Sequence, residues 1–156
     1  MIRASSRRSG FTLLEILLVT VILAILLGLV TPRFRNSFDS LQFKNFVLNT
    51  AALLRYAHDR AILEKETYRL AFRQNPAGCR LEKSSGDQFK TLKDRTGAAQ
   101  RLPDGVQTNL DVSEIVLYPD GNATAAAWSF SDRQGKAMTI HVSGASGTVT
   151  VEESGG

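Results

Sequence analysis

Residues 11–30 form an apolar run of twenty residues that contains one ionisable side chain, Glu15. A helix of this length rises about 30 Å, which is the thickness of the hydrocarbon core of a bilayer. A carboxylate placed in hydrocarbon costs roughly 2 to 3 kcal/mol, and somewhat less near a helix end. The run is therefore predicted to span a membrane, and Glu15 is predicted to need a positively charged partner there.

The residues before this run are basic. Arg3, Arg7 and Arg8 precede the run, and residues 1–10 contain no acidic side chain. Positively charged flanks stay on the cytoplasmic side of a membrane. The charge pattern therefore predicts a cytoplasmic N-terminus and places the residues after Val30 on the opposite side.

Gly10 immediately precedes Phe11, and Glu15 is the fifth residue counted from Phe11. This N-terminus resembles that of prepilins, the precursors of type IV pilins and type II secretion pseudopilins. The resemblance implies cleavage after Gly10 by a membrane-embedded peptidase, which then methylates the amino group of Phe11. It also implies that Glu15 pairs with the α-amino group of Phe11 in a neighbouring subunit. Such a pair sets the register of a filament even where its net stabilisation is small.

Other N-terminal signals fit the sequence less well. A secretory signal peptide has a shorter apolar core followed by a small-x-small cleavage site, and residues 28–32 offer no such site. A lipoprotein signal needs a cysteine after the core, whereas the single cysteine is Cys79. The pair Arg7-Arg8 invites interpretation as a twin-arginine signal. However, Gly10 before the apolar run and the carboxylate of Glu15 within it fit a prepilin better. An ordinary single-pass anchor remains the alternative.

Composition bounds the size and the partners of the rest of the chain. The net charge of +4 falls to +1 without residues 1–10, since three of the nineteen bases lie there and fifteen acids remain. The net charge of the chain therefore does not indicate that it binds nucleic acid. About 126 residues follow the apolar run, which is enough for one domain. One cysteine excludes an internal disulfide, and we expect Cys79 to be a core residue.

Apolar residues continue to recur at the helical period beyond Pro32. Pilin helices commonly carry a proline at this position, which loosens or kinks the backbone. One stripe, interrupted by Thr50, is expected to pack on a sheet: Phe43, Phe46, Val47, Leu54, Ala57 and Ala61. A second apolar set lies on the opposite side: Phe34, Phe38, Leu41, Leu48 and Ala52. We interpret the second set as a surface for neighbouring helices, the alternative being that a C-terminal strand or loop covers it.

Past Glu66 the apolar period changes from 3.6 to 2. Residues 67–73 alternate, with Tyr68, Leu70 and Phe72 predicted to face inward. A turn at residues 75–78 should lead into an antiparallel return strand at 79–83. Further strands are expected at residues 89–92, 115–118, 125–130, 137–142 and 148–151. One long helix followed by short antiparallel strands predicts an α+β, pilin-like fold.

Several later segments resemble the GspH/FimT class of minor pseudopilins and minor pilins. They are residues 57–62 at the helix end, 68–72, 117–121 and 147–151. The resemblance implies four parts: a leader at 1–10, a transmembrane and filament-core helix at 11–31, an amphipathic helix at 32–66, and a β-rich periplasmic domain at 67–156. His58 departs from the pattern, because relatives often carry arginine there.

Charge is unevenly distributed along the β-rich part. Residues 69–103 carry a net charge of +5, and residues 104–156 carry −5. A head with one basic and one acidic side could orient subunits in a filament. The alternative is that these charges form solvated faces that neutralise each other within one sheet.

The sequence offers no catalytic or metal-binding pattern. His58 and His141 are the two histidines, and neither has metal-ligand spacing. No nucleophile elbow or phosphate-binding loop is present. Oxygen ligands for calcium could come from Asp111, Ser113, Glu114 and Asp120, but their spacing does not demand it. We therefore expect a non-catalytic chain without cofactor, metal or small-molecule substrate.

The resemblance implies a minor pseudopilin of type II secretion, which joins a filament tip and helps to export folded proteins across the outer membrane. Its implied partners are the prepilin peptidase and methyltransferase, other pseudopilins and the inner membrane. The alternative within the family is a FimT-like minor pilin for pilus assembly or DNA uptake. The acidic end, Glu152-Glu153, argues against DNA, whereas the basic 69–103 segment favours it. A membrane-anchored periplasmic enzyme is the alternative outside the family.

Overall fold

The computed structural model describes residues 11–86, 88–92 and 99–154, with the side chains of residues 28–37 left out. Contacts divide the chain into two units, residues 1–38 and residues 39–156. One long helix, α1 (Leu13–Glu64), contributes to both units. Its assignment runs through Pro32 without a break, so the predicted loosening at that position does not interrupt the helix.

The helix ends two residues before the predicted boundary at residue 66. Lys65 adopts a left-handed backbone conformation (φ 55°), and the N–H of Glu66 donates to the carbonyl oxygen of Ala61 at 3.2 Å. This bond is the signature of a Schellman motif, which satisfies a carbonyl at the helix end and reverses the chain direction. The reversal leads directly into the first strand.

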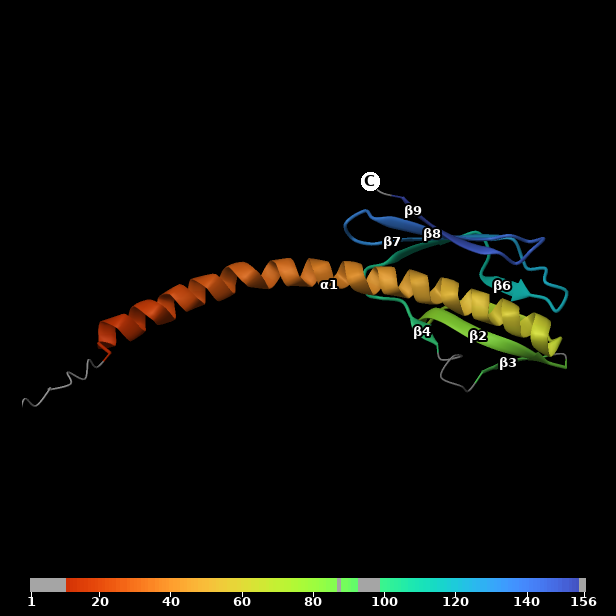
Figure 1. The fold of residues 1–156 in the computed structure, drawn as a ribbon, viewed down its shortest axis with the longest axis horizontal. Helices are drawn as coiled ribbons and strands as arrows, with labels where there is room; N and C mark the ends of the chain where they lie inside the picture. Colours follow the sequence, from red (N-terminus) through yellow and green to blue (C-terminus); the bar gives the residue numbers. More distant parts are fainter. Residues whose placement is uncertain (1–10, 87, 93–98, 155–156) are drawn as a thin grey trace, which may run out of the picture. The chain divides into compact units, whose positions relative to one another are not determined.

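Nine strands follow the helix and form two antiparallel sheets within the described residues (Figure 1). Sheet A has the order β3-β2-β1-β6, with β4 also paired to β2, and sheet B has the order β5-β7-β8-β9. The strands are β1 (Tyr68–Gln74), β2 (Ala77–Ser85), β3 (Gln88–Thr91), β4 (Gln100–Arg101), β5 (Gln107–Leu110), β6 (Glu114–Leu117), β7 (Ala126–Ser131), β8 (Ala137–Val142) and β9 (Val149–Ser154).

The α+β class and most strands agree with the sequence analysis. The β1–β2 hairpin pairs Leu70 with Leu81 and Phe72 with Cys79, so the alternation of residues 67–73 is correct. Two strands were not predicted, β4 and β5. Five of their six residues are polar and four are exposed, so they lack the apolar alternation that marks a strand in a sequence.

The core lies where the second half of α1 meets both sheets. All six residues of the predicted stripe are buried, and the stripe is confirmed. The ring of Phe46 packs edge-on against Phe130 of β7, with centroids 5.4 Å apart. The largest fully buried side chain is Trp128, whose Nε1 donates to the backbone oxygen of Val112 at 2.8 Å. Burial of the aromatic rings thus joins the helix to sheet B.

Cys79 is fully buried under α1, as expected for a core residue. Burial raises the pKa of its thiol to about 12. A thiol with so high a pKa is not a thiolate at neutral pH, so Cys79 acts here as a small apolar side chain.

Candidate processing and assembly site

The start of α1 is fixed by Thr12. Its Oγ1 accepts the backbone N–H of Glu15 at 3.3 Å, and its carbonyl oxygen accepts the N–H groups of Glu15 and Ile16. Thr12 is therefore the N-cap residue of the helix. Glu15 lies in the first turn, where a carboxylate interacts favourably with the helix dipole.

This cap was missed in the sequence analysis, although its signal is present. The segment Thr12-Leu13-Leu14-Glu15 has the spacing of a capping box, in which a threonine is followed three residues later by glutamate. Glu15 thus has a local role at the helix start besides the predicted role between subunits. The two roles are compatible, because the cap uses the backbone N–H of Glu15 and leaves its carboxylate free to bind elsewhere.

The predicted site residues lie at or just before this cap. Phe11 precedes the helix, and its side chain is 77% exposed. Glu15 is also exposed. Gly10, the residue before the predicted cleavage point, lies outside the described residues. The predicted pairing of Glu15 with Phe11 joins two chains, so it stays a prediction.

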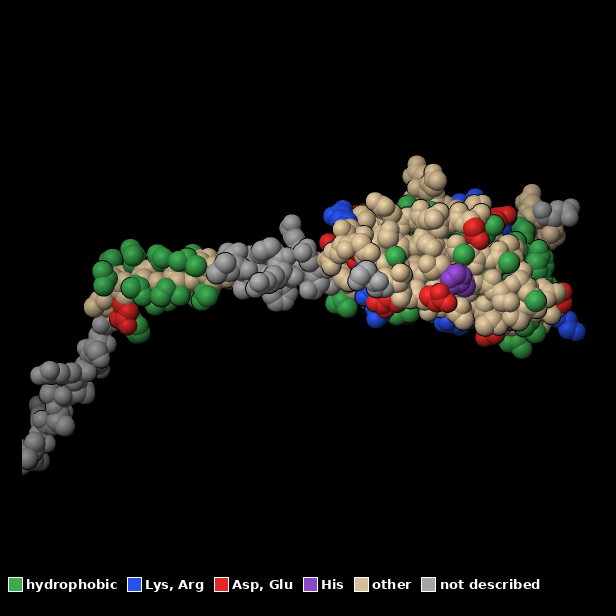
Figure 2. All heavy atoms as spheres, turned by 90° about the horizontal axis from the view of Figure 1, so that it is seen from above, with side chains coloured by type: hydrophobic (Ala, Val, Ile, Leu, Met, Phe, Trp, Pro, Cys, Tyr) green, Lys and Arg blue, Asp and Glu red, His purple; other side chains and the backbone are tan. Residues whose placement is uncertain are grey.

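The helix after this start presents apolar side chains on all its sides. Every large hydrophobic residue among residues 11–27 is at least 46% exposed. The space-filling view shows these side chains gathered along the segment (Figure 2). An exposed helix that is hydrophobic all round requires an apolar environment or partner.

The predicted membrane span at residues 11–31 stays a prediction. Its last four residues belong to the side chains that the structure leaves out. Among the described residues, no helix combines the length and the apolar character needed to cross a bilayer.

The second apolar face of α1 is exposed, as predicted. Phe38 is 60% exposed, Leu41 59% and Leu48 41%, and Ala52 is also exposed. Phe34, the remaining member, lies among the side chains that are not described. The alternative, a C-terminal strand or loop covering this face, is therefore wrong for the four residues described.

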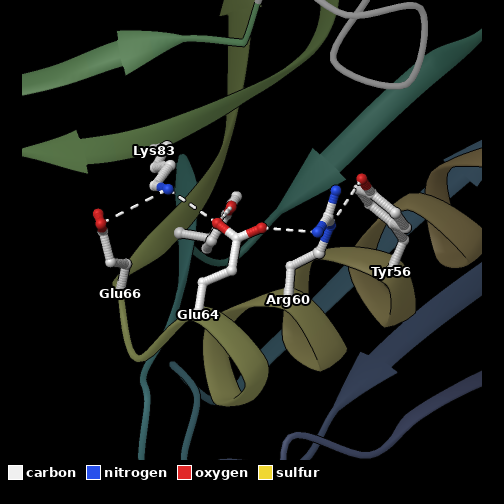
Figure 3. Close-up of polar contacts among 6 residues, drawn as sticks. Tyr56, Arg60, Glu64, Glu66 and Lys83 are labelled. Carbon is white, nitrogen blue, oxygen red and sulfur yellow. Dashed lines mark hydrogen bonds and ion pairs between the residues drawn. The ribbon is translucent and has the colours of Figure 1, made fainter.

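The C-terminal end of α1 is attached to sheet A by a polar network (Figure 3). The carboxylate of Glu64 accepts hydrogen bonds from Lys83 Nζ at 2.8 Å and Tyr68 Oη at 2.6 Å. Arg60 Nη1 lies 2.7 Å from the same carboxylate, and Arg60 Nε donates to Tyr56 Oη. The sequence did not reveal this network, because it depends on the register that brings β2 beside the helix end.

The network shifts the pKa values of its members. The hydrogen bond from Lys83, followed by that from Tyr68, lowers the pKa of Glu64. The bond to Glu64 raises the pKa of Lys83, and burial raises that of Tyr68 to about 12. The charged forms of Glu64 and Lys83 are thus the forms that the fold favours.

The remaining candidates for chemistry have structural contacts instead. His58 Nε2 lies 2.9 Å from the carbonyl oxygen of Gly121, so this half-buried ring holds α1 to the β6–β7 loop. His141 lies beside Glu152 on sheet B. Asp111 accepts the backbone N–H groups of Val112 and Ala127. In the described part of the chain, no three His, Cys, Asp or Glu residues gather as metal ligands.

Comparisons with known proteins agree with these features. The family model described as the prokaryotic N-terminal methylation motif matches residues 5–31. Among solved structures, the fold is similar to the minor pseudopilin EpsH from the Type 2 Secretion System of Vibrio cholerae. That match has a TM-score of 0.64 and 14% identity, and it covers 74% of this chain and 99% of the EpsH chain. No curated protein matches the sequence.

Residues 5–31 match the methylation motif, and the helix that begins within this segment continues into the head with its two sheets. The fold of the chain is similar to that of the minor pseudopilin EpsH.

Proposed function

We propose that this chain is a minor pseudopilin subunit of a type II secretion pseudopilus. It is made with a leader at residues 1–10, cleaved after Gly10 and methylated on Phe11. Residues 11–31 hold it in the bacterial inner membrane, with the head in the periplasm. It then joins the filament tip through α1, contacts other pseudopilins and supports export of folded proteins. Its role is structural and not catalytic.

The observation that carries this proposal is the organisation of α1. The methylation motif covers the first part of the helix, and the far part of the same helix forms the core of a pseudopilin head. On the opposite side of this far part and just before it, the described members of the second apolar face have no cover from the described residues of their own chain: Phe38, Leu41, Leu48 and Ala52. A helix that is apolar where its own fold does not need it fits a subunit that packs beside copies of similar helices.

Processing is tested by co-expressing the chain with a prepilin peptidase. In Gly10→Val, the side chain adjoins the bond to be cut, and we expect the uncut precursor to accumulate. Ser9→Ala is the matched control, because it alters the neighbouring residue and should be processed normally. Immunoblotting measures the ratio of precursor to mature chain. Normal processing of Gly10→Val would refute the assigned cleavage site.

A further inference from the structure

The outer face of sheet A carries a row of residues that crosses three strands. In the register, Arg73 of β1 pairs with Gly78 of β2, and Gly78 pairs with Arg101 of β4. Paired residues point to the same face of a sheet, and the next residues along point to the other. That other face is the helix side, since Cys79 is fully buried and its partner Gln100 contacts Thr50 of α1. Arg73 and Arg101 therefore point away from the helix.

Arg80 joins this row from two residues further along β2, on the same outer face. Strands lie about 4.8 Å apart, so the backbones of Arg73 and Arg101 are roughly 10 Å apart across Gly78. The three arginines line a cavity of about 210 Å³, together with Gly78, Pro76 and Ala99. This arginine pocket belongs wholly to the head, residues 39–156.

Gly78 allows the backbone of β4 to lie beside β2 at the pocket. Its φ is +153°, and a Cβ atom built on it would lie 2.1 Å from the carbonyl oxygen of Gln100. A side chain at position 78 would therefore collide with the backbone of β4. The absence of that side chain lets the backbone of β4 pair with β2, which places Arg101 on the same face as Arg73.

The charges on this face do not balance. Glu82 Oε2 lies 2.9 Å from Arg69 Nε, and its Oε1 lies 3.5 Å from Arg73 Nη2. Glu114 lies 3.0 Å from Arg69 as well. Glu82 and Glu114 thus form ion pairs with Arg69, and Glu82 also pairs with Arg73. Arg80 and Arg101 form no ion pair with the described residues, which leaves two guanidinium groups for an external anion.

We propose that the arginine pocket binds carboxylate groups of an acidic segment of a partner protein. Guanidinium groups bind carboxylates through paired hydrogen bonds, and Arg80 and Arg101, which line the pocket without an ion pair to the described residues, suit one or two acidic side chains. The site deepens the proposed function by adding a contact surface that does not involve α1, and it rests on that function for a protein partner.

The same face is unsuited to nucleic acid. A phosphate backbone is bound along a continuous basic groove with free aromatic rings for stacking. Here Glu82 and Glu114 pair with Arg69, and Glu82 also lies beside Arg73, so the basic surface is interrupted and forms no continuous groove. The ring of Phe89 is covered by the Arg69 guanidinium, 4.0 Å from its centroid. A short acidic peptide needs neither a continuous groove nor a stacking ring.

The test measures binding of fluorescein-labelled hexaglutamate to the full chain in detergent by fluorescence anisotropy at low salt. We expect saturable binding that hexaglutamine lacks. The double variant Arg80→Gln/Arg101→Gln should bind roughly tenfold more weakly or worse. The matched control Lys65→Gln/Lys90→Gln makes the same change in net charge at exposed positions outside the pocket, and should bind as the unaltered chain does.

The other outcomes overturn the site. They are no binding to the unaltered chain, equal weakening in both double variants, or tighter binding of a single-stranded oligonucleotide than of hexaglutamate. Circular dichroism checks that each variant is folded. If Arg80→Gln/Arg101→Gln is not folded, Arg80→Lys/Arg101→Lys replaces it, because it keeps the charge and loses the guanidinium fork; unweakened binding then overturns the site. None of these results depends on leader cleavage, so they are distinct from failure of the proposed function.

Discussion

Thr50 is a polar residue in the middle of the buried stripe of α1. Its side chain is fully buried, and its Oγ1 lies 2.8 Å from the carbonyl oxygen of Phe46 and 3.1 Å from the side-chain amide of Gln100. The first contact is the usual internal bond of a helical threonine, and the second ties the helix to β4. A buried hydroxyl is tolerated here because it has partners.

Replacement of Thr50 by valine should destabilise the head by about 1 kcal/mol, since the Gln100 amide loses its partner on the helix. Thr150→Val, at an exposed position of β9, should change stability by less than about 0.5 kcal/mol. Urea unfolding of residues 39–156, which contain the whole buried core, measures both values. An unchanged or raised stability of Thr50→Val would contradict the role assigned to its hydroxyl.

At the scale of elements, α1 has two ends with different attachments. The N-terminal end is capped by Thr12 and has its apolar surface exposed, whereas the C-terminal end is fixed to β1 and β2 by Glu64, Lys83 and Tyr68. This second attachment depends on pH. Because the folded pKa of Glu64 lies below its ordinary value of 4.5, its contribution is complete above that value and is lost as the pH falls through the lowered pKa.

Acid unfolding of residues 39–156 should therefore become steeper below about pH 4.5 in the unaltered head. Lys83→Met removes the leading cause of the Glu64 shift and should flatten part of this dependence. Lys90→Met is the matched control, since it removes an exposed lysine that forms no ion pair with the described residues and leaves Glu64 and Lys83 in place. Stability measured by urea unfolding between pH 3 and pH 7 tests this. An identical pH dependence for Lys83→Met and the unaltered head would contradict it.

Periodicity predicted the parts of the fold that bury apolar residues at regular spacing. The stripe from Phe43 to Ala61 and the alternation in β1 are of this kind. Strands β4 and β5 were missed because they are short and mostly polar, and their contacts through Gln100 with Thr50 and through Leu110 with the core leave no repeating pattern in the sequence. The candidate site residues came from a resemblance at Gly10, Phe11 and Glu15, whereas the arginine pocket depends on strand register that no local pattern reveals.

At the scale of the whole molecule, the separation of basic and acidic segments along the sequence is only partly kept between the two sheets. Most of the basic segment folds into sheet A, and most of the acidic segment folds into sheet B. Glu114, however, belongs to the acidic segment and lies in sheet A, where it pairs with Arg69. Neutralisation within one sheet is thus real at Arg69, whereas Arg80 and Arg101 form no ion pair with the described residues. The head therefore carries a local basic site at these two arginines and not one uniformly basic side.

The central claim is that α1 assembles into a filament through Glu15. Glu15→Gln keeps the backbone N–H that Thr12 caps and removes only the charge, so it separates the local role from the pairing between subunits. Glu15→Leu removes the polar group as well. Both variants should insert and be cleaved, since neither changes the bond after Gly10.

The decisive measurement is incorporation of the chain into pseudopili, quantified by immunoblotting of sheared filaments from cells that express the other pseudopilins. We expect the unaltered chain in the filament fraction, and mature Glu15→Gln and Glu15→Leu to stay in the membrane fraction. Normal incorporation of both cleaved variants would contradict the account.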